Sequence, residues 1–371
     1  MTPADLSRCV VRAVRCAVAD GELAAGAAAP ERVVVERTRP GGVGDYATPV
    51  AFQVAKAAGC PPREVAGVLA RRLGAEPGIE RVEVTGAGFL NFVLPAPSAP
   101  AVIAAAIMRD AVIRDVCRAA GRAPTADESR SGPGGGGLRE RVVRRSVLRL
   151  LHVQGASECA LPAARPAAPP TAPAGDPATA PAATPAGALP AARPTAPAGD
   201  PPTAPPVAPV ARRDGDVVAR YGVDAARWAM LAAPARETPS FSDVLLVQGE
   251  ASEVFRVRYA HARSRALVRN AAQLGFRPEA GDVDDAPALL RLLADHPLVL
   301  EAAAHHRAPE RLTRHLVELA DALLDFQYRV LPQGDEKPSA AHRARLALAE
   351  AAGTVLAGGL ALLGMDAPER L

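Results

Sequence analysis

The histidines, the cysteines and one glycine-rich stretch of this 371-residue chain are the groups that could perform chemistry, and their spacing does not favour a catalytic site. The five cysteines form no Cys-x-x-Cys pair, which is typical of reduced thiols in a cytoplasmic protein. His305 and His306 lie in a predicted helix without an acidic or cysteine partner at ligand spacing. The glycine-rich residues 131–137 lack the Gly-Lys-Ser/Thr sequence of a phosphate-binding P-loop. The sequence therefore predicts no enzyme, no metal site and no cofactor.

The charge of the chain does not by itself indicate a nucleic-acid-binding protein. The formal net charge is +3, and residues 1–160 are more basic than residues 212–371. Nearly all basic residues are arginines, so an arginine excess alone is weak support for phosphate binding. Any binding of RNA must come from a specific surface. Because no run of about 18 apolar residues and no signal peptide is visible, we expect no membrane contact.

The elements that must position any site fall into four segments. Residues 1–120 combine helical patterns, at 3–20 and 99–120, with alternating runs at 79–85 and 88–94 that predict a β-hairpin. Residues 121–160 hold the glycine-rich joint and one further helix. Residues 161–211 are rich in Pro and Ala and contain the octet Pro-Thr-Ala-Pro-Ala-Gly-Asp-Pro twice, which predicts a disordered linker. Residues 212–371 predict only helices, at 216–232, 250–274, 286–305, 309–331 and 338–363.

The predicted fold class is therefore α+β. It comprises a small N-terminal α/β domain, a disordered Pro/Ala-rich linker and a C-terminal all-α helical bundle.

The N-terminal segment resembles the N-terminal domain of arginyl-tRNA synthetases. It carries Gly-Asp-Tyr-Ala-Thr at 44–48, followed by a helix of the family's pattern at 50–56. Pro-Arg-Glu-Val-Ala at 62–66 and the run at 82–92 continue the resemblance. The motifs cover about residues 5–95 in the family's order and spacing, so the resemblance implies that domain's fold.

The C-terminal segment resembles the α-helical anticodon-binding domain of the same family. Residues 221–228 resemble the element that gives this domain its Asp-Ala-Leu-Arg (DALR) name, with Ala226 in place of leucine. Residues 255–263 stand where the family has its Tyr-Ala-His-Ala-Arg helix. The match covers about residues 212–371 and implies a DALR-type helical domain.

The region between these two segments resembles only fragments of the family's catalytic domain. Residues 138–155 resemble the helix that follows the first ATP-binding signature, and Gly134–Gly137 stand where its histidines should be. Residues 210–218 resemble an eroded second signature, with Arg212 and Arg213 at the basic positions. Adenylate formation needs imidazoles and a mobile lysine directed at the developing phosphate charge. The resemblance therefore implies that aminoacylation and nucleotide binding have been lost.

The resemblance also implies candidate contacts with the anticodon loop. Tyr259 stands where the family presents a tyrosine to that loop, and it could stack on an unpaired base. Four arginines of the same predicted helix could contact phosphates: Arg256, Arg258, Arg263 and Arg265. The alternative is a solvated helix face, partly paired with Glu250 and Glu253. Both interpretations stay open at the level of sequence.

A second candidate contact lies on the predicted hairpin. Phe89 and Asn91 share one face of its second strand, and Leu90 and Phe92 share the other. If Leu90 and Phe92 form the core, Phe89 could stack on a D-loop base while Asn91 hydrogen-bonds the edge of that base. The alternative is that Phe89 packs on a neighbouring helix.

The combined prediction is a non-catalytic, cytoplasmic tRNA-binding paralogue of arginyl-tRNA synthetase, with arginine tRNA as its partner. A protein partner in tRNA-dependent metabolism is also compatible with this prediction. Two alternatives stay open: a protein–protein interaction module that has lost RNA binding, and the tRNA-binding half of a split synthetase. The linker adds the hypothesis that the two end domains form a flexible clamp on one tRNA.

Overall fold

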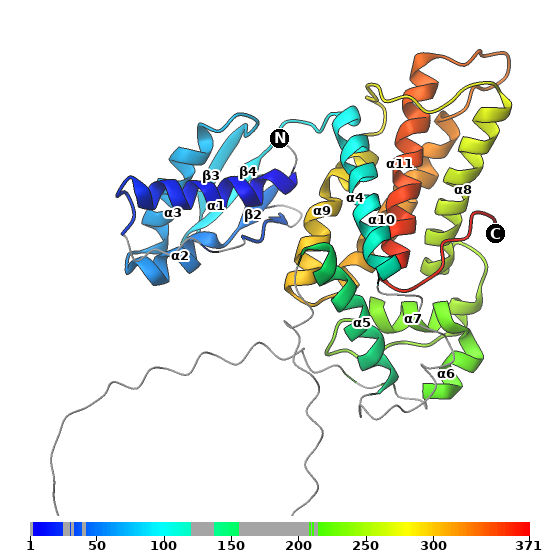
Figure 1. Cartoon of the computed structure of the whole chain (residues 1–371), viewed down its shortest axis with the longest axis horizontal. Helices are drawn as coiled ribbons and strands as arrows, with labels where there is room; N and C mark the ends of the chain where they lie inside the picture. The colour runs from blue at the N-terminus through cyan, green and yellow to red at the C-terminus, as the bar shows by residue number, and fades with distance from the viewer. Residues whose placement is uncertain are drawn as a thin grey trace, which may run out of the picture.

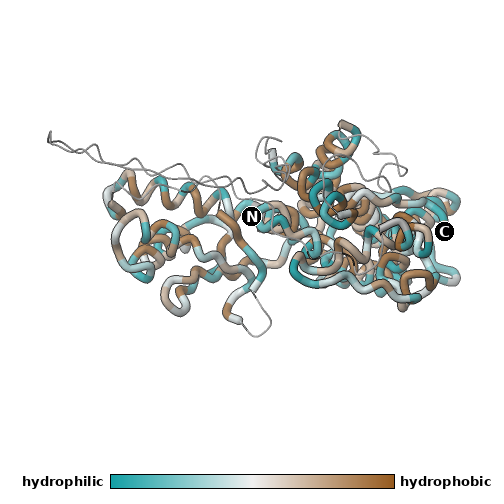
Figure 2. The backbone as a smooth tube through the Cα atoms, turned by 90° about the horizontal axis from the view of Figure 1, so that it is seen from below, coloured by the Kyte–Doolittle hydropathy of each residue, from teal (hydrophilic) through white to brown (hydrophobic). Residues whose placement is uncertain are grey.

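The computed structural model describes residues 3–24, 30, 33–38, 42–119, 137–155, 208, 210 and 214–371. Nearly all of the predicted linker at 161–211 lies outside the described residues, as do Cys159, Gly134–Gly136, Arg212 and Arg213. The described residues form two lobes that lie side by side (Figure 1). Figure 2 shows hydrophilic and hydrophobic residues alternating around the helices of both lobes, as expected of amphipathic helices.

The N-terminal lobe is an α/β unit with a four-stranded antiparallel sheet. Its elements are α1 (Pro3–Ala19), β1 (Glu36–Arg37), β2 (Tyr46–Thr48), α2 (Val50–Ala58), α3 (Pro62–Gly74), β3 (Arg81–Thr85) and β4 (Phe89–Val93). The strand order is β1-β2-β4-β3, so the predicted hairpin of β3 and β4 is confirmed. Leu90 and Phe92 are fully buried and form the core together with apolar residues of α1, α2 and α3.

The Gly-Asp-Tyr sequence at 44–46 connects this sheet to the rest of the molecule. Gly44 has a φ of +75°, and a Cβ at this position would lie 2.9 Å from the carbonyl oxygen of Phe92, so only glycine fits. The Asp45 amide donates to the Phe92 carbonyl at 2.7 Å, and its carboxylate accepts from the Leu94 amide at 3.2 Å. These contacts fix the chain before β2 and direct Tyr46 towards the second lobe.

The second lobe is all-helical. Its elements are α4 (Ala99–Ala119), α5 (Leu138–Val153), α6 (Asp214–Tyr221), α7 (Val223–Ala232), the 3₁₀ helix η2 (Asp243–Leu246), α8 (Glu253–Gln273), α9 (Pro287–His305), α10 (Glu310–Phe326), the 3₁₀ helix η3 (Gln327–Arg329) and α11 (Ala340–Leu362). The α+β class, with a C-terminal helical bundle, is confirmed. One apolar core runs through these helices.

Two helices belong to a different lobe from the one that their sequence position suggested. Residues 1–120 were assigned to the N-terminal domain, but Val102, Ile103 and Ile113 of α4 are buried in the helical core. Helix α5, interpreted as a fragment of a lost domain, buries Val142, Val147 and Leu150 in the same core. The N-terminal lobe therefore ends at β4, and residues 94–98 connect the lobes.

This topology overturns the clamp hypothesis. The Pro/Ala-rich segment follows α5 and precedes α6, and both helices belong to the helical lobe. At the far end of that segment the Ala208 amide donates to the Ala235 carbonyl at 2.8 Å, and Arg139 donates to the Ala208 carbonyl at 2.9 Å. The segment therefore leaves and re-enters one lobe, and it does not separate two tRNA-binding domains.

The two lobes meet in a direct junction along α9 (Figure 1). Leu298 of α9 is buried in the apolar core of the N-terminal lobe. Asp295, one turn earlier, accepts a hydrogen bond from the Tyr46 hydroxyl and pairs with Arg37 at 2.7 Å. Glu36 pairs with Arg311 of α10 at 2.8 Å. Because these contacts come from both lobes, the lobes form one unit.

A pair of buried histidines lies beside this junction. His296 and His315 stack with ring centroids 5.3 Å apart, and they are 2% and 4% exposed. In the part of the chain that the structure describes, neither ring nitrogen of His296 has a hydrogen-bond partner. Burial, followed by the proximity of Arg37, lowers the pKa of His315 to about 4. Burial, followed by His315 and Arg109, also lowers the pKa of His296.

We expect the folded protein to lose stability as the pH falls from about 6.5 towards 4. In this range the unfolded chain protonates both histidines, whereas the folded chain keeps them neutral. His315 alone should remove about 2–3 kcal/mol from the free energy of unfolding. Asp295 acts in the opposite direction because burial raises its pKa. Urea unfolding at pH 7 and at pH 4.5, compared between the native chain and His296→Leu/His315→Leu, isolates the histidines. Equal pH dependence in the two proteins would contradict the prediction.

Helix α11 is long and apolar enough to cross a membrane by length and composition, and it is the one such helix among the described residues. Of its most apolar window, 72% is buried inside the protein. A core helix of a bundle has the same properties, so this observation adds little support for a membrane span.

Candidate nucleic-acid interface

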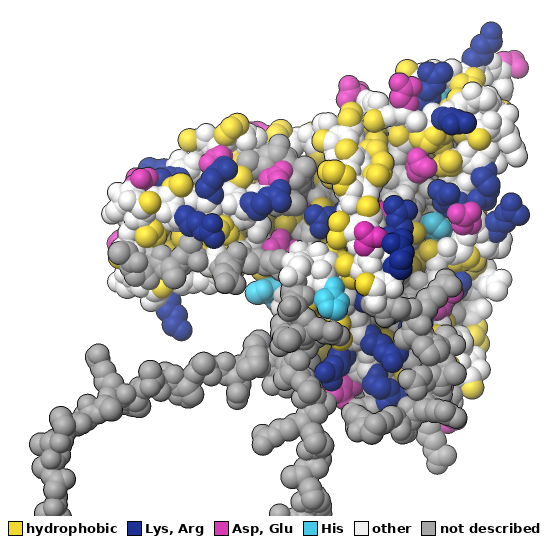
Figure 3. Space-filling view, viewed as in Figure 1, with side chains coloured by type: hydrophobic (Ala, Val, Ile, Leu, Met, Phe, Trp, Pro, Cys, Tyr) yellow, Lys and Arg dark blue, Asp and Glu magenta, His cyan; other side chains and the backbone are white. Residues whose placement is uncertain are grey.

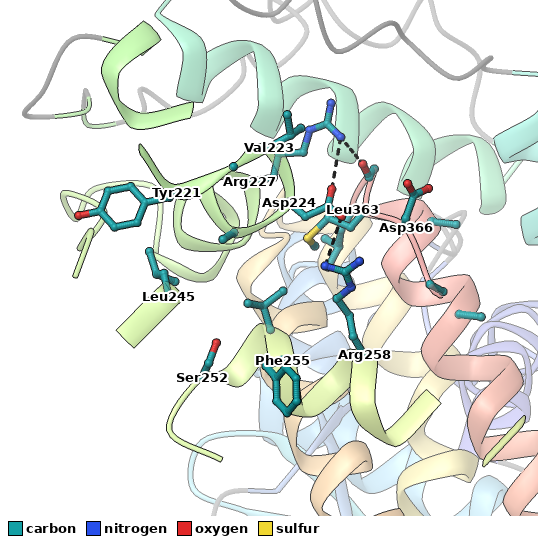
Figure 4. Close-up of a pocket in the computed structure, with 18 of the residues that line it drawn as sticks. Tyr221, Val223, Asp224, Arg227, Leu245, Ser252, Phe255, Arg258, Leu363 and Asp366 are labelled. Atoms are coloured by element: carbon teal, nitrogen blue, oxygen red, sulfur yellow. Dashed lines mark hydrogen bonds and ion pairs between the residues drawn. The ribbon is translucent and has the colours of Figure 1, made fainter. Parts of the chain in front are cut away.

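A groove with a volume of about 1370 Å³ opens at one end of the helical lobe (Figure 4). The beginnings of α7 and α8 form two of its walls, and residues of α4, α5, η2, α11 and the segment after α11 also line it. Its described lining contains five arginines and two aspartates: Arg118, Arg145, Arg149, Arg227, Arg258, Asp224 and Asp366. The groove therefore combines an excess of positive charge with apolar walls, a lining that suits single-stranded nucleic acid.

An aromatic pair lies at the edge of the groove. Tyr259 is 40% exposed, and its ring stacks on Phe255 with centroids 5.8 Å apart and planes inclined by 10°. The two residues are one helical turn apart on α8 and both line the groove. A flat, exposed ring of this kind can stack on an unpaired base. Tyr259 was predicted from the sequence as a contact, but the packing of its ring against Phe255 was not predicted.

The arginines of α8 divide between two sides of the helix. Arg256 pairs with Asp321 of α10 at 3.1 Å, and Arg263 donates to the side-chain oxygen of Gln327. Arg258 faces Asp224 at 3.7 Å, and Arg265 faces Glu369 at 3.4 Å. Of these four arginines only Arg258 lines the groove.

The partners of these arginines differ from the predicted ones. The sequence suggested pairing with Glu250 and Glu253 on the same stretch of chain, whereas the observed carboxylates come from other elements. Glu253 instead accepts a hydrogen bond from the Trp228 indole at 3.2 Å. The arginines therefore brace α8 against its neighbours.

Asp224 belongs to the element that resembles the DALR sequence, and it lines the groove together with Arg227 and Arg258. Its carboxylate lies 3.7 Å from Arg258 and 3.9 Å from Arg227. The three labelled side chains lie close together in Figure 4. Burial raises the pKa of Asp224, while the two arginines act in the opposite direction. The carboxylate thus holds two guanidinium groups inside the groove.

His261 of the same helix has a structural role. It is 5% exposed, and its Nδ1 lies 3.0 Å from the Gly353 carbonyl oxygen of α11. Burial lowers its pKa. His261 therefore joins α8 to α11 and does not face the groove.

The two hairpin residues are separated from the groove and have unequal surroundings. Phe89 is 45% exposed and meets the Phe52 ring edge-on at 5.0 Å. Asn91 is 5% exposed, and its amide donates to the Thr85 hydroxyl at 2.7 Å. Phe89 thus packs on a neighbouring helix, as the alternative interpretation expected, and part of its ring is also exposed. The Asn91 amide is instead hydrogen-bonded within the sheet.

Among the described residues, no group of three or more His, Cys, Asp or Glu side chains could hold a metal ion. The chemistry of the groove is therefore that of its arginines, aspartates and aromatic rings.

The structure thus combines a small α/β unit with a helical bundle whose groove is lined by arginines beside two stacked aromatic rings. Residues 8–94 match the family model of the arginyl tRNA synthetase N terminal domain, and residues 257–371 match that of the DALR anticodon binding domain. The chain therefore carries two domains of the arginyl-tRNA synthetase family, the N-terminal domain and the DALR anticodon-binding domain.

Solved structures of arginyl-tRNA synthetases resemble the chain. The enzyme from Thermus thermophilus matches with a TM-score of 0.54 and 16% identity over 100% of both chains, a likeness of fold alone. A structure from Campylobacter jejuni is 23% identical over 43% of this chain, with a TM-score of 0.37. The chain covers 36% of the length of that relative.

Proposed function

We propose that this protein binds tRNA in the cytoplasm without aminoacylating it, with arginine tRNA as the preferred ligand. The observation that carries the proposal is the exposed Tyr259 ring, supported by Phe255 and adjoining a groove in which arginines outnumber aspartates. Unpaired anticodon bases offer faces that stack on such a ring, and the loop phosphates attract the arginines. A bound tRNA could then be sequestered or delivered to an enzyme of tRNA-dependent metabolism.

The first test is to purify the protein from its native host at low salt and to sequence the RNA that accompanies it. We expect one tRNA to be enriched and Tyr259→Ala to weaken its binding by about 10-fold, since stacking contributes about 1–3 kcal/mol per base. Tyr328→Ala is the matched control, because this tyrosine is 68% exposed and lies outside the lining of the groove. Equal loss in both variants, or no enriched tRNA, would contradict the proposal.

The non-catalytic part of the proposal has its own test. The glycines at 134–137 replace the imidazoles that adenylate formation requires, so we expect no arginine-dependent exchange between ATP and pyrophosphate. An exchange rate above that of a buffer control, retained through purification, would refute the loss of catalysis while leaving tRNA binding intact.

A second candidate function is a protein–protein interaction module. It is favoured by the outward face of α4, where Ile107, Met108 and Val112 are 52%, 69% and 49% exposed. Hydrophobic side chains gather over this helix in Figure 3. Such a patch is unusual on a protein without partners. A protein recovered stoichiometrically with the native chain, and lost on Met108→Glu, would support this function over RNA binding.

A further inference from the structure

An exposed aromatic pair lies on the N-terminal lobe, apart from the groove. Phe89 is the first residue of β4 and is 45% exposed, and the Phe52 ring of α2 meets it edge-on with centroids 5.0 Å apart. Neither ring lines the groove of the helical lobe. The exposed part of Phe89 can stack on an unpaired base, as the Tyr259 ring can. The N-terminal lobe therefore offers a second surface for a single-stranded nucleotide.

Two helices bring positive charge to this aromatic pair. Lys56 lies one helical turn after Phe52 on α2, so the two residues share a face of that helix. Arg63 lies in the first turn of α3, and this end of α3 touches the hairpin, since a Cβ on Gly88 would be 3.0 Å from Pro62. Gly88 directly precedes the exposed ring of β4. Both cations therefore lie beside the aromatic pair.

The two cations differ from the arginines of α8, which face carboxylates of other elements. Lys56 and Arg63 are both exposed, and within the described part of the chain neither has an ion pair or a side-chain hydrogen bond. Glu64 follows Arg63 in the first turn of α3, but consecutive residues of a helix do not face each other. Their charge is therefore available to neutralise phosphates and to release counterions from RNA.

We propose that Lys56 and Arg63 bind the phosphates on either side of a tRNA nucleotide whose base stacks on Phe89. This inference rests on the proposed function and adds a second RNA contact to the groove. The arginine presents parallel donors that match two phosphate oxygens, and the lysine acts as a compact point charge. The competing role is a solvated surface, in which neither cation contacts RNA. The two roles make different predictions for the salt dependence of binding.

The test compares two variants that remove one lysine and one arginine each. Lys56→Gln/Arg63→Gln removes the cations beside the aromatic pair, and Lys337→Gln/Arg277→Gln removes exposed cations of the helical lobe that do not line the groove. Binding of an unmodified arginine tRNA transcript is measured by filter retention from about 50 to 200 mM salt. We expect the first variant to bind about 10-fold or more weakly and to reduce the slope of log K against log salt by about 1.4, at about 0.7 per single-strand phosphate. We expect the control variant to keep the native slope.

Two further variants separate the base from its phosphates. Lys56→Arg/Arg63→Lys keeps both charges and should keep the native slope. Phe89→Ala should weaken binding by about 10-fold and leave the slope unchanged, because stacking releases no counterions. Native affinity in Phe89→Ala would overturn the stacking that the inference requires.

The outcomes distinguish this inference from the proposed function. A native slope in Lys56→Gln/Arg63→Gln, or an equal reduction in the control variant, overturns the inference and leaves tRNA binding by the groove standing. No binding by the native chain overturns the proposed function and this inference with it. Because both cations are exposed, thermal melting of Lys56→Gln/Arg63→Gln should match that of the native chain, so a reduced slope reports on RNA contact and not on unfolding.

Discussion

Arg139→Ala is expected to lower the free energy of unfolding by about 3–5 kcal/mol, a large fraction of the stability of a typical domain. The side chain is 1% exposed, and its guanidinium donates to five backbone carbonyls, those of Ala208, Met230, Ala233, Pro234 and Glu237. Alanine would remove the donor that these five carbonyls share, although the Pro234 carbonyl keeps the Glu237 amide as a donor at 2.9 Å, and it would open a cavity of arginine size. Burial lowers the pKa of the guanidinium, and Glu310 and Glu237 oppose this effect.

Chemical denaturation followed by the fluorescence of Trp228 measures the effect, because this single tryptophan is buried in the same lobe. Arg139→Lys should recover part of the stability, since an ammonium group keeps the charge but has three donors for five acceptors. Arg144→Ala on the same helix is the control and should cost much less, because its side chain is only half-buried. A native unfolding midpoint for Arg139→Ala would refute the role of the guanidinium network.

The same network explains why the place of α5 could not be predicted from the sequence. The resemblance of residues 138–155 to a helix of the family predicted a helix here, and α5 confirms it. The acceptors of Arg139 are backbone carbonyls at residues 208–237, and a carbonyl has no side chain that a sequence pattern can reveal. The resemblance placed the helix in a lost domain, whereas its buried face belongs to the bundle.

The helices of the C-terminal lobe and the hairpin could be predicted closely, because their periodicity is local. The partners of the α8 arginines could not be predicted. Spacing along one helix reveals neighbours three or four residues away, but Asp321 lies 65 residues from Arg256. Tyr259 was found by resemblance, whereas its packing on Phe255 and the place of Arg145 and Arg149 in the groove lining became visible only in the folded structure. Local structure was thus accessible from sequence, and the composition of the site was not.

Asp295→Ala is expected to release the N-terminal lobe from α9 while both lobes stay folded. Asp295 and Tyr46 are each 5% exposed, and loss of the carboxylate leaves the Tyr46 hydroxyl buried without this acceptor and Arg37 without its partner. Leaving the buried Tyr46 hydroxyl without its acceptor costs about 1–3 kcal/mol, and the loss of the pair with the half-exposed Arg37 adds little. The covalent connection is the short segment at 94–98, and the contacts that remain are those of Leu298 and the pair of Glu36 with Arg311, so the lobes should separate more readily than in the native chain.

Small-angle scattering should detect this separation as a larger radius of gyration, and limited proteolysis should produce a new cut near residues 94–98. Asp295→Asn keeps an acceptor for the Tyr46 hydroxyl but loses the charge that attracts Arg37, so its effect should be intermediate. Asp115→Ala is the matched control, because its pair with Arg118 is largely exposed and contributes little. If Asp295→Ala scatters like the native chain and resists the protease equally, Leu298 and the pair of Glu36 with Arg311 are sufficient to hold the lobes together. If the lobes of Asp295→Ala separate as expected, the Asp295 carboxylate determines the position of the N-terminal domain relative to the groove, and therefore how both could contact RNA.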